Sequence, residues 1–105
     1  MAFNVTNKAE GNNAFITLSG ELDAASAPQF KSAIETAATE HPANLVLMMQ
    51  DLSYIASAGL RVLIFAKQKL GPQVSLYVIG AQPQVVDTLQ KTGFDRSCIM
   101  QETYA

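Results

Sequence analysis

Ser57 is the residue best placed to do chemistry, because it lies in a segment of mostly small residues, 54–60, between an apolar run and an amphipathic run. This pattern predicts a strand-to-helix connection, which in parallel βα units is the usual functional edge. A serine at the start of a helix can act as an N-cap and accept an N–H from the first turn. It can also carry a phosphate, because the free N–H groups and the dipole of a helix N-terminus accommodate an anion. Spacing alone favours the cap.

Few other side chains could support catalysis. The chain has one histidine, His41, and one cysteine, Cys98, which excludes an internal disulfide and a cysteine-rich metal site. A catalytic triad would need His41, which we expect at a helix end away from most loops. The sequence contains no glycine-rich phosphate loop and no nucleophile elbow. A hydrolase using Ser57 therefore has no base to activate it, and we expect a non-enzymatic protein without a cofactor.

Glu21 and Asp23 form a second polar feature in the predicted loop 19–23. Two neighbouring carboxylates can do acid–base work. More often such a pair solvates a loop or caps the next helix, so the pair alone does not indicate an enzyme.

Composition limits the remaining functions. The 105 residues fit one domain, 1–105, and 49% of them are hydrophobic, which is enough for a packed core. Seven scattered Lys and Arg against nine Asp and Glu give a net charge of −2, which argues against nucleic-acid binding. The first ten residues lack a signal-peptide pattern, and the apolar run Leu45–Met49 is too short for a membrane span. We expect a cytoplasmic chain.

Local patterns place these residues on an alternating series of elements. Short apolar or alternating segments predict five strands, at 3–6, 14–18, 45–49, 74–79 and near 97–100. Helical spacing and proline or glycine boundaries predict three helices, from Ser26 to about His41, from about Ser57 to Leu70, and from about Gln82 to Gly93. Residues 11–13 form the turn of an N-terminal hairpin, and 19–23 and 50–56 read as loops. The order predicts an α/β fold with parallel strands and right-handed crossovers.

The second predicted helix has two faces. Its apolar residues predict a core-facing side, and its polar residues Arg61, Lys67 and Gln68 predict an outer side. The residues assigned to the core side are Leu60, Leu63, Ile64 and Leu70.

Two motifs stand out, residues 18–23, Leu-Ser-Gly-Glu-Leu-Asp, and residues 51–63, Asp-Leu-Ser-Tyr-Ile-Ala-Ser-Ala-Gly-Leu-Arg-Val-Leu. Together they resemble the motifs of the bacterial anti-sigma factor antagonists of the STAS family. The likeness in element order spans nearly the whole chain. It implies a mixed central β-sheet with an N-terminal hairpin and about three to four helices packed against it. Ala56 stands where family members often carry an aspartate before the phosphoserine.

The resemblance implies a partner-switching function. The unphosphorylated antagonist binds an anti-sigma factor that is also a serine kinase of the GHKL ATPase type, and this binding releases the sigma factor. Phosphorylation of Ser57 switches the binding off, and a PPM-type serine phosphatase restores it. The implied partner-binding residues are Glu21, Asp23, Ser53, Ala56, Ser57, Ala58, Gly59 and Arg61, with Asp23 the stronger candidate in the acidic loop.

An alternative within the same family is a structural subunit of a lipid-transport ABC complex or of a stress-signalling assembly. Such a subunit would keep one constitutive partner, and Ser57 would serve only as a helix cap. In either case we expect the isolated chain to be a monomer.

Overall fold

The computed structural model describes residues 3–104, which form one mixed β-sheet with helices. The elements in chain order are β1 (Asn4–Glu10), β2 (Asn13–Leu22), α1 (Ala27–Ala38), β3 (Asn44–Ile55), α2 (Ser57–Leu70), β4 (Ser75–Ile79), α3 (Pro83–Thr92), the short 3-10 helix η1 (Phe94–Ser97) and β5 (Ile99–Gln101).

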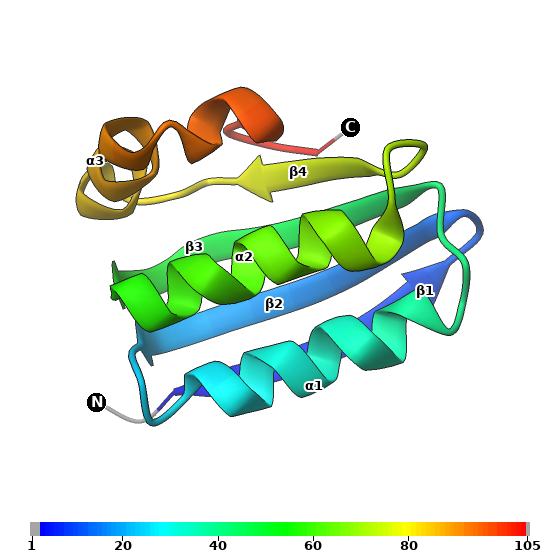
Figure 1. Ribbon diagram of the computed structural model, residues 1–105, viewed down its shortest axis with the longest axis horizontal. Coiled ribbons are helices and arrows are strands. Elements are labelled where there is room, and N and C mark those ends of the chain that lie inside the picture. Colours follow the sequence, from blue (N-terminus) through cyan, green and yellow to red (C-terminus); the bar gives the residue numbers. More distant parts are fainter. Residues whose placement is uncertain (1–2, 105) are drawn as a thin grey trace.

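The strands lie side by side in the order β1-β2-β3-β4-β5 (Figure 1). The hairpin strands β1 and β2 are antiparallel, and each later strand is parallel to the one before it. The predicted mixed α/β architecture with an N-terminal hairpin is therefore confirmed. Because the later strands are parallel, their carboxyl ends all point to the same edge of the sheet, where β2, β3 and β4 lead into the three helices.

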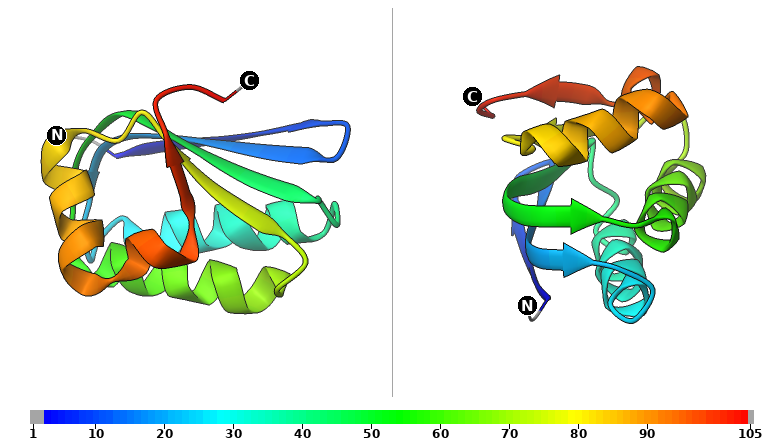
Figure 2. Two further views of the ribbon diagram at one scale, coloured as in Figure 1. Left: turned by 90° about the horizontal axis from the view of Figure 1, so that it is seen from above. Right: turned by 90° about the vertical axis from the view of Figure 1, so that its left-hand side faces the viewer.

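The helices share one core on one face of the sheet, a point that the sequence left open. Figure 2 shows α1 and α2 covering this face, with α3 beside β4. Apolar side chains from all three helices join those of β2 and β3 in a single buried cluster; the fully buried members include Ile16, Leu18, Phe30, Ile34, Leu47, Leu63, Val85 and Leu89. No helix among the described residues is long and apolar enough to cross a membrane.

Two segments predicted as loops belong to strands. Residues 19–22 and 50–55 continue β2 and β3, whose parallel pairing runs as far as Leu22 with Ile55. Two register shifts place extra residues in β3 along this stretch. The residues of β3 in the main core consequently change from a spacing of two, ending at Met49, to a spacing of three, Leu52 and Ile55. β-Bulges cause such shifts. They interrupt the alternation of buried and exposed residues by which a strand is predicted from sequence.

Helix boundaries follow the predicted signals more closely. Ser26 is the N-cap of α1, and Pro28 stands in its first turn. The helix ends at Ala38, slightly before His41 and Pro42, where the sequence predicted its end. Gly93 ends α3 in the left-handed conformation, with φ at 80°, which favours glycine.

The helix-free face of the sheet is partly covered by Tyr104. Val46 is fully buried although it lies outside the main core cluster, and its register neighbours are Phe15 and Tyr77. The ring of Tyr104 packs edge-on against both, with centroid distances of 5.6 Å to Phe15 and 4.9 Å to Tyr77. Its hydroxyl donates to Asn13 Oδ1 at 3.0 Å.

Candidate functional site

Ser57 is the first residue of α2, and its side chain is exposed. The N-cap is Ala56, which is extended (φ −91°, ψ 171°) and provides no side-chain cap. The interpretation of Ser57 as an N-cap is therefore wrong, since the helix begins at Ser57 itself. Within residues 3–104 the structure gives the Ser57 hydroxyl no hydrogen-bond partner, so this oxygen is available for modification.

The first turn of α2 presents free donors around this hydroxyl. The first helical hydrogen bond runs from the Leu60 N–H to the Ala56 carbonyl at 3.1 Å. The N–H groups of Ser57, Ala58 and Gly59 come before it and, in the described part of the chain, donate to no carbonyl. The first turn also contains no acidic residue. The positive end of the helix dipole would stabilise an anion at this position, and no carboxylate in the turn would repel it.

Strand β2 fixes the position of this turn. The Ala56 N–H donates to the Leu22 carbonyl at 2.8 Å, so the segment before Ser57 lies directly beside the end of β2. Gly59 is buried, and a Cβ there would lie 2.6 Å from Leu22 Cγ and 3.1 Å from Ile55 Cγ1. A glycine is therefore required for α2 to approach both strands this closely.

Asp23 follows β2 and organises the turn that precedes α1. Its Oδ1 accepts hydrogen bonds from the N–H groups of Ala25 and Ser26, both at 3.1 Å, and lies 3.0 Å from Ser26 Oγ. These bonds, with the Ser26 hydroxyl foremost, lower the pKa of the Asp23 carboxyl. Ser26 is itself buried and lies within 2.9 Å of the Glu21 carbonyl. The sequence motif marked Asp23 but not Ser26, whose burial depends on this fold.

The remaining predicted site residues surround Ser57 at different depths. Ser53 is half-buried, and its hydroxyl donates to the Gly20 carbonyl at 3.0 Å, so it ties β3 to β2. Glu21 is half-buried at the end of β2, opposite Tyr54. Arg61 is exposed one turn after Ser57 and forms no ion pair with another described residue.

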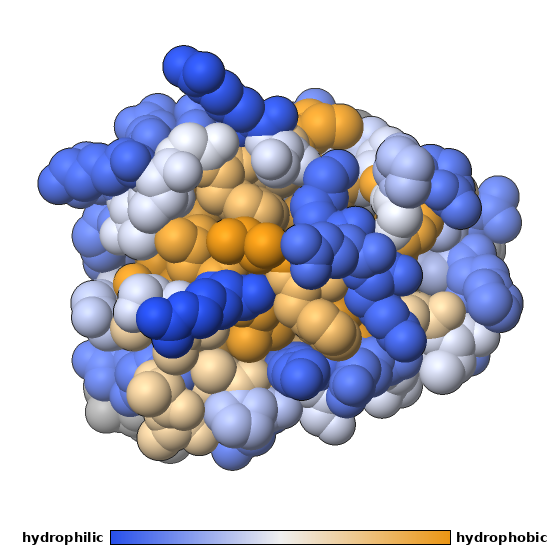
Figure 3. Space-filling model, in the orientation of Figure 1, coloured by the Kyte–Doolittle hydropathy of each residue, from blue (hydrophilic) through white to orange (hydrophobic). Residues whose placement is uncertain are grey.

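An outward-facing row on α2 continues from Ser57. Ser57, Leu60, Arg61 and Ile64 have the spacing of one helical face, and we call them the outer stripe of α2. Ile64 is 44% exposed, which contradicts its assignment to the core. The buried side of α2 consists of Gly59, Val62, Leu63 and Ala66. The core assignment of Leu63 is therefore confirmed, and Leu60 and Leu70 pack against the core as half-buried residues. Figure 3 shows apolar surface over α2 among hydrophilic side chains.

The family assignment rests on a match that covers almost the entire fold. The model of the STAS domain family matches residues 4–105. The chain belongs to the STAS domain family. No curated protein gives a significant sequence match to this STAS domain.

Solved structures share the fold of this STAS domain. An anti-sigma factor antagonist from Mycobacterium paratuberculosis has a TM-score of 0.88 at 24% identity, covering 97% of this chain and 87% of its own. A putative anti-sigma factor antagonist from Thermotoga maritima has a TM-score of 0.83 at 17% identity, with 94% and 86% covered. The anti-sigma factor antagonist SpoIIAA, in its unphosphorylated form, has a TM-score of 0.79 at 22% identity, with 97% and 89% covered.

The same fold accommodates a phosphorylated relative. The Bacillus cell fate determinant SpoIIAA in its phosphorylated form has a TM-score of 0.71 at 21% identity, covering 97% of this STAS domain and 92% of its own chain. Among the described residues of this STAS domain, no group of three His, Cys, Asp or Glu side chains is arranged to hold a metal ion.

Proposed function

We propose that this STAS domain is an anti-sigma factor antagonist and that phosphorylation of Ser57 switches off its binding to an anti-sigma factor. The observation that carries the proposal is the exposed Ser57 hydroxyl at the first position of α2, which has no side-chain partner among the described residues. Free N–H groups in the same turn accommodate the phosphate without unfolding the helix. The modification then changes the surface charge and leaves the fold intact.

The outer stripe of α2 supports partner binding at the same position. Leu60 and Ile64 give it apolar area, and Arg61 gives it a charge with no ion-pair partner in the described chain. Arginine is enriched among the residues that dominate binding energy in interfaces, and exposed apolar area beside it can pack against a partner. Glu21, Asp23, Ser53, Ala56, Ala58 and Gly59 shape the border of this surface or the turn that presents Ser57.

Electrostatics make a single phosphate sufficient for most of the switch. Two unit charges about 4 Å apart repel by about 4 kcal/mol at an effective dielectric constant near 20. Shifting a complex from 99:1 to 1:99 requires about 5.5 kcal/mol. A phosphoserine carries up to two negative charges at neutral pH, so its repulsion by a carboxylate of the partner would supply most of this free energy.

An enzymatic use of Ser57 does not fit the geometry. His41 precedes β3 and Ser57 follows it, and β3 runs along most of the molecule, whose longest dimension is 31 Å (Figure 1). A serine nucleophile needs a base within hydrogen-bond reach. We propose instead that Ser57 is a phosphoacceptor, with a GHKL-type kinase and a PPM-type phosphatase as its partners in the cytoplasm.

A comparative pull-down from the native cell tests the proposal. Tagged wild-type chain, Ser57→Asp and the matched control Ser32→Asp, an exposed serine on α1, are compared by mass spectrometry. We expect a GHKL-type kinase with the wild type and the control and its loss with Ser57→Asp. The recovered kinase should phosphorylate the wild type with ATP and leave Ser57→Ala unmodified.

Retention of the partner by Ser57→Asp would contradict the switch. A transporter or scaffold protein bound equally by all three forms would instead assign the chain as a constitutive subunit. That result would also remove the cytoplasmic kinase and phosphatase from the proposal.

A further inference from the structure

Strand β3 continues well beyond its neighbour β4. The last register pair between them is Met48 with Ile79, whereas β3 extends to Ile55. From Met49 onwards, no strand within residues 3–104 therefore lies beside the edge of β3 on the β4 side. Backbone groups on such an edge need other partners or remain open to unwanted strand pairing.

Two glutamines at the N-terminal end of α3 supply those partners. Gln82 Nε2 donates to the Gln50 carbonyl at 2.9 Å, and Gln84 Nε2 donates to the Ser53 carbonyl at 2.7 Å. Gln84 Nε2 also lies 3.1 Å from Gln82 Oε1, which links the two amides. We call Gln82 and Gln84 the glutamine clamp, since the N-cap and the first turn of α3 hold the free edge of β3 through them.

The connection into α3 passes directly against the same edge. A Cβ at Gly80 would lie 2.5 Å from Gln50 Cγ, and Gly80 has a φ of 67°. Glycine is required here both by the close approach and by the positive φ. The connection between β4 and α3 therefore brings the glutamine clamp close to this edge of β3.

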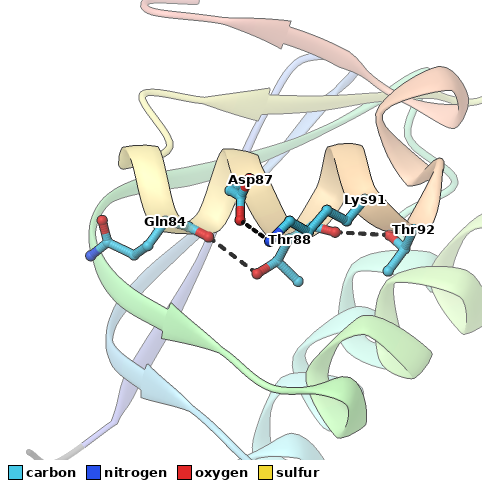
Figure 4. A network of polar contacts seen from close by, with 5 residues as sticks. All are labelled: Gln84, Asp87, Thr88, Lys91 and Thr92. Carbon is cyan, nitrogen blue, oxygen red and sulfur yellow. Dashed lines mark hydrogen bonds and ion pairs between the residues drawn. The ribbon is translucent and has the colours of Figure 1, made fainter.

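The helix that carries the clamp has several side-chain contacts along its surface (Figure 4). Thr88 Oγ1 donates to the Gln84 carbonyl at 3.1 Å, and Thr92 Oγ1 donates to the Thr88 carbonyl at 3.0 Å. Lys91 and Asp87 form an i,i+4 ion pair at 2.9 Å. Figure 4 shows the Gln84 side chain leaving the first turn of this helix toward β3.

Ser53 is held from both sides as a result. Its hydroxyl donates to the Gly20 carbonyl of β2 at 3.0 Å, and its carbonyl accepts from Gln84 at 2.7 Å. Ser53 lies four residues before Ser57, and only Tyr54, Ile55 and Ala56 separate them. We propose that the glutamine clamp positions Ser57 by fixing the strand that delivers it to the start of α2. The value of this positioning for phosphorylation rests on the function proposed above.

A thiol introduced at position 57 reports the position directly. In a Cys98→Ala background, Ser57→Cys places a thiol in the first turn of α2, where a helix N-terminus lowers the pKa of a cysteine. The pH profile of its alkylation by iodoacetamide then gives that pKa. The background substitution removes Cys98, a half-buried thiol whose pKa burial raises to about 11.

Gln84→Met tests the clamp, because methionine has a similar length and cannot donate to the Ser53 carbonyl. The matched control is Gln90→Met, which changes an exposed glutamine of the same helix. We expect Gln84→Met to raise the pKa of the introduced thiol and to slow its alkylation at pH 7 by about threefold. Gln90→Met should leave the profile unchanged. Amide hydrogen exchange should show faster exchange at Ala56 in Gln84→Met.

Identical pH profiles and identical Ala56 exchange in the two variants would overturn the proposal and leave the clamp as a local cover for two carbonyls. A cooperative melt of Gln84→Met, measured first, ensures that the comparison is between folded proteins. If the profile moves but no kinase phosphorylates Ser57, the clamp stands and the proposed function fails. If Ser57 is phosphorylated and the pH profile does not move, the proposed function stands and the clamp proposal fails.

Discussion

At the scale of single residues, Ala56 and Ser57 differ by one position at the start of α2, and this difference determines their roles. Ala56 occupies the N-cap, where a polar side chain would bond to the first turn, and it has none to offer. Ser57 lies one residue later with its hydroxyl exposed. The helix start is thus left without a side-chain cap, and the donors of its first turn remain open to an anion.

The uncapped start predicts that Ala56→Asp and Ala56→Asn both stabilise the protein. Each introduces a preferred N-cap side chain, and a new cap contributes about 0.5–2 kcal/mol. Urea denaturation at pH 7 should show a higher midpoint with an unchanged m-value for both. If neither variant gains stability, the N-cap assignment of Ala56 is wrong; a gain for aspartate alone would indicate a charge effect.

Gly59→Ala should destabilise the fold by about 1–3 kcal/mol, because overpacking a well-packed site costs that much. The added Cβ would meet Leu22 at 2.6 Å. In a Leu22→Ala background the same substitution should cost less, because Leu22 Cγ and Cδ2, the atoms that the added Cβ would meet, are absent. Urea denaturation of the four proteins in this double-mutant cycle measures the coupling. Strict additivity would show that the contact with Leu22 is not the cause.

At the scale of elements, the turn between β2 and α1 shows how the acidic motif functions. Asp23 accepts two backbone N–H groups and lies close to the buried Ser26 hydroxyl. Its carboxylate therefore shapes the loop beside Ser57 whether or not a partner also contacts it. The parallel pairing of β2 and β3 then carries this loop to the side of the α2 N-terminus.

The lowered pKa of Asp23 gives stability a defined pH dependence. A carboxyl whose pKa is lower in the folded state stabilises it above the unfolded pKa, about 3.9, and loses this contribution as pH falls through the folded pKa. Asp23→Asn should therefore be less stable than the wild type at pH 7, with a smaller difference near pH 3. Urea midpoints at both pH values measure it.

Ser26→Ala is the companion variant, because the Ser26 hydroxyl is the main cause of the lowered Asp23 pKa. In the Ser26→Ala background, Asp23→Asn should lower stability at pH 7 by less than it does in the otherwise wild-type chain. If the difference in stability between wild type and Asp23→Asn is the same at pH 7 and pH 3, the charge of Asp23 does not contribute to stability.

At the scale of the whole molecule, the two faces of the sheet are closed by different means. Helices from three separate parts of the chain bury one face. Tyr104 covers Val46 on the other by packing between Phe15 and Tyr77. Its hydroxyl and Asn44 Nδ2 both donate to Asn13 Oδ1. A residue near the end of the described chain therefore contacts both β2 and β4.

Removing this contact should lower global stability. Tyr104→Phe should cost about 1 kcal/mol through the lost hydrogen bond, and Tyr104→Ala about 2–3 kcal/mol through the further loss of two aromatic contacts. The matched control Tyr54→Ala removes a tyrosine that is 50% exposed and should change stability by about 0.5 kcal/mol or less. Equal urea midpoints for Tyr104→Ala and Tyr54→Ala would show that the covering ring does not contribute.

Local signals in the sequence were sufficient for the element order, the hairpin, the approximate helix starts and the location of Ser57 at the beginning of α2. Proline in a first helical turn, glycine after a helix and alternating apolar residues depend on neighbours only a few positions away. The STAS motifs are also short stretches of sequence, and they indicated Asp23, Ser53 and Gly59 as site residues.

Only the tertiary structure decided which surfaces these elements present. Ile64 is apolar and still faces outward, because the core side of α2 is defined by Gly59 packing on Leu22 and Ile55. The bulged end of β3, the glutamine clamp and the cover over Val46 all join residues far apart in the chain. Such contacts depend on the packing of whole elements, and no short window of sequence records them.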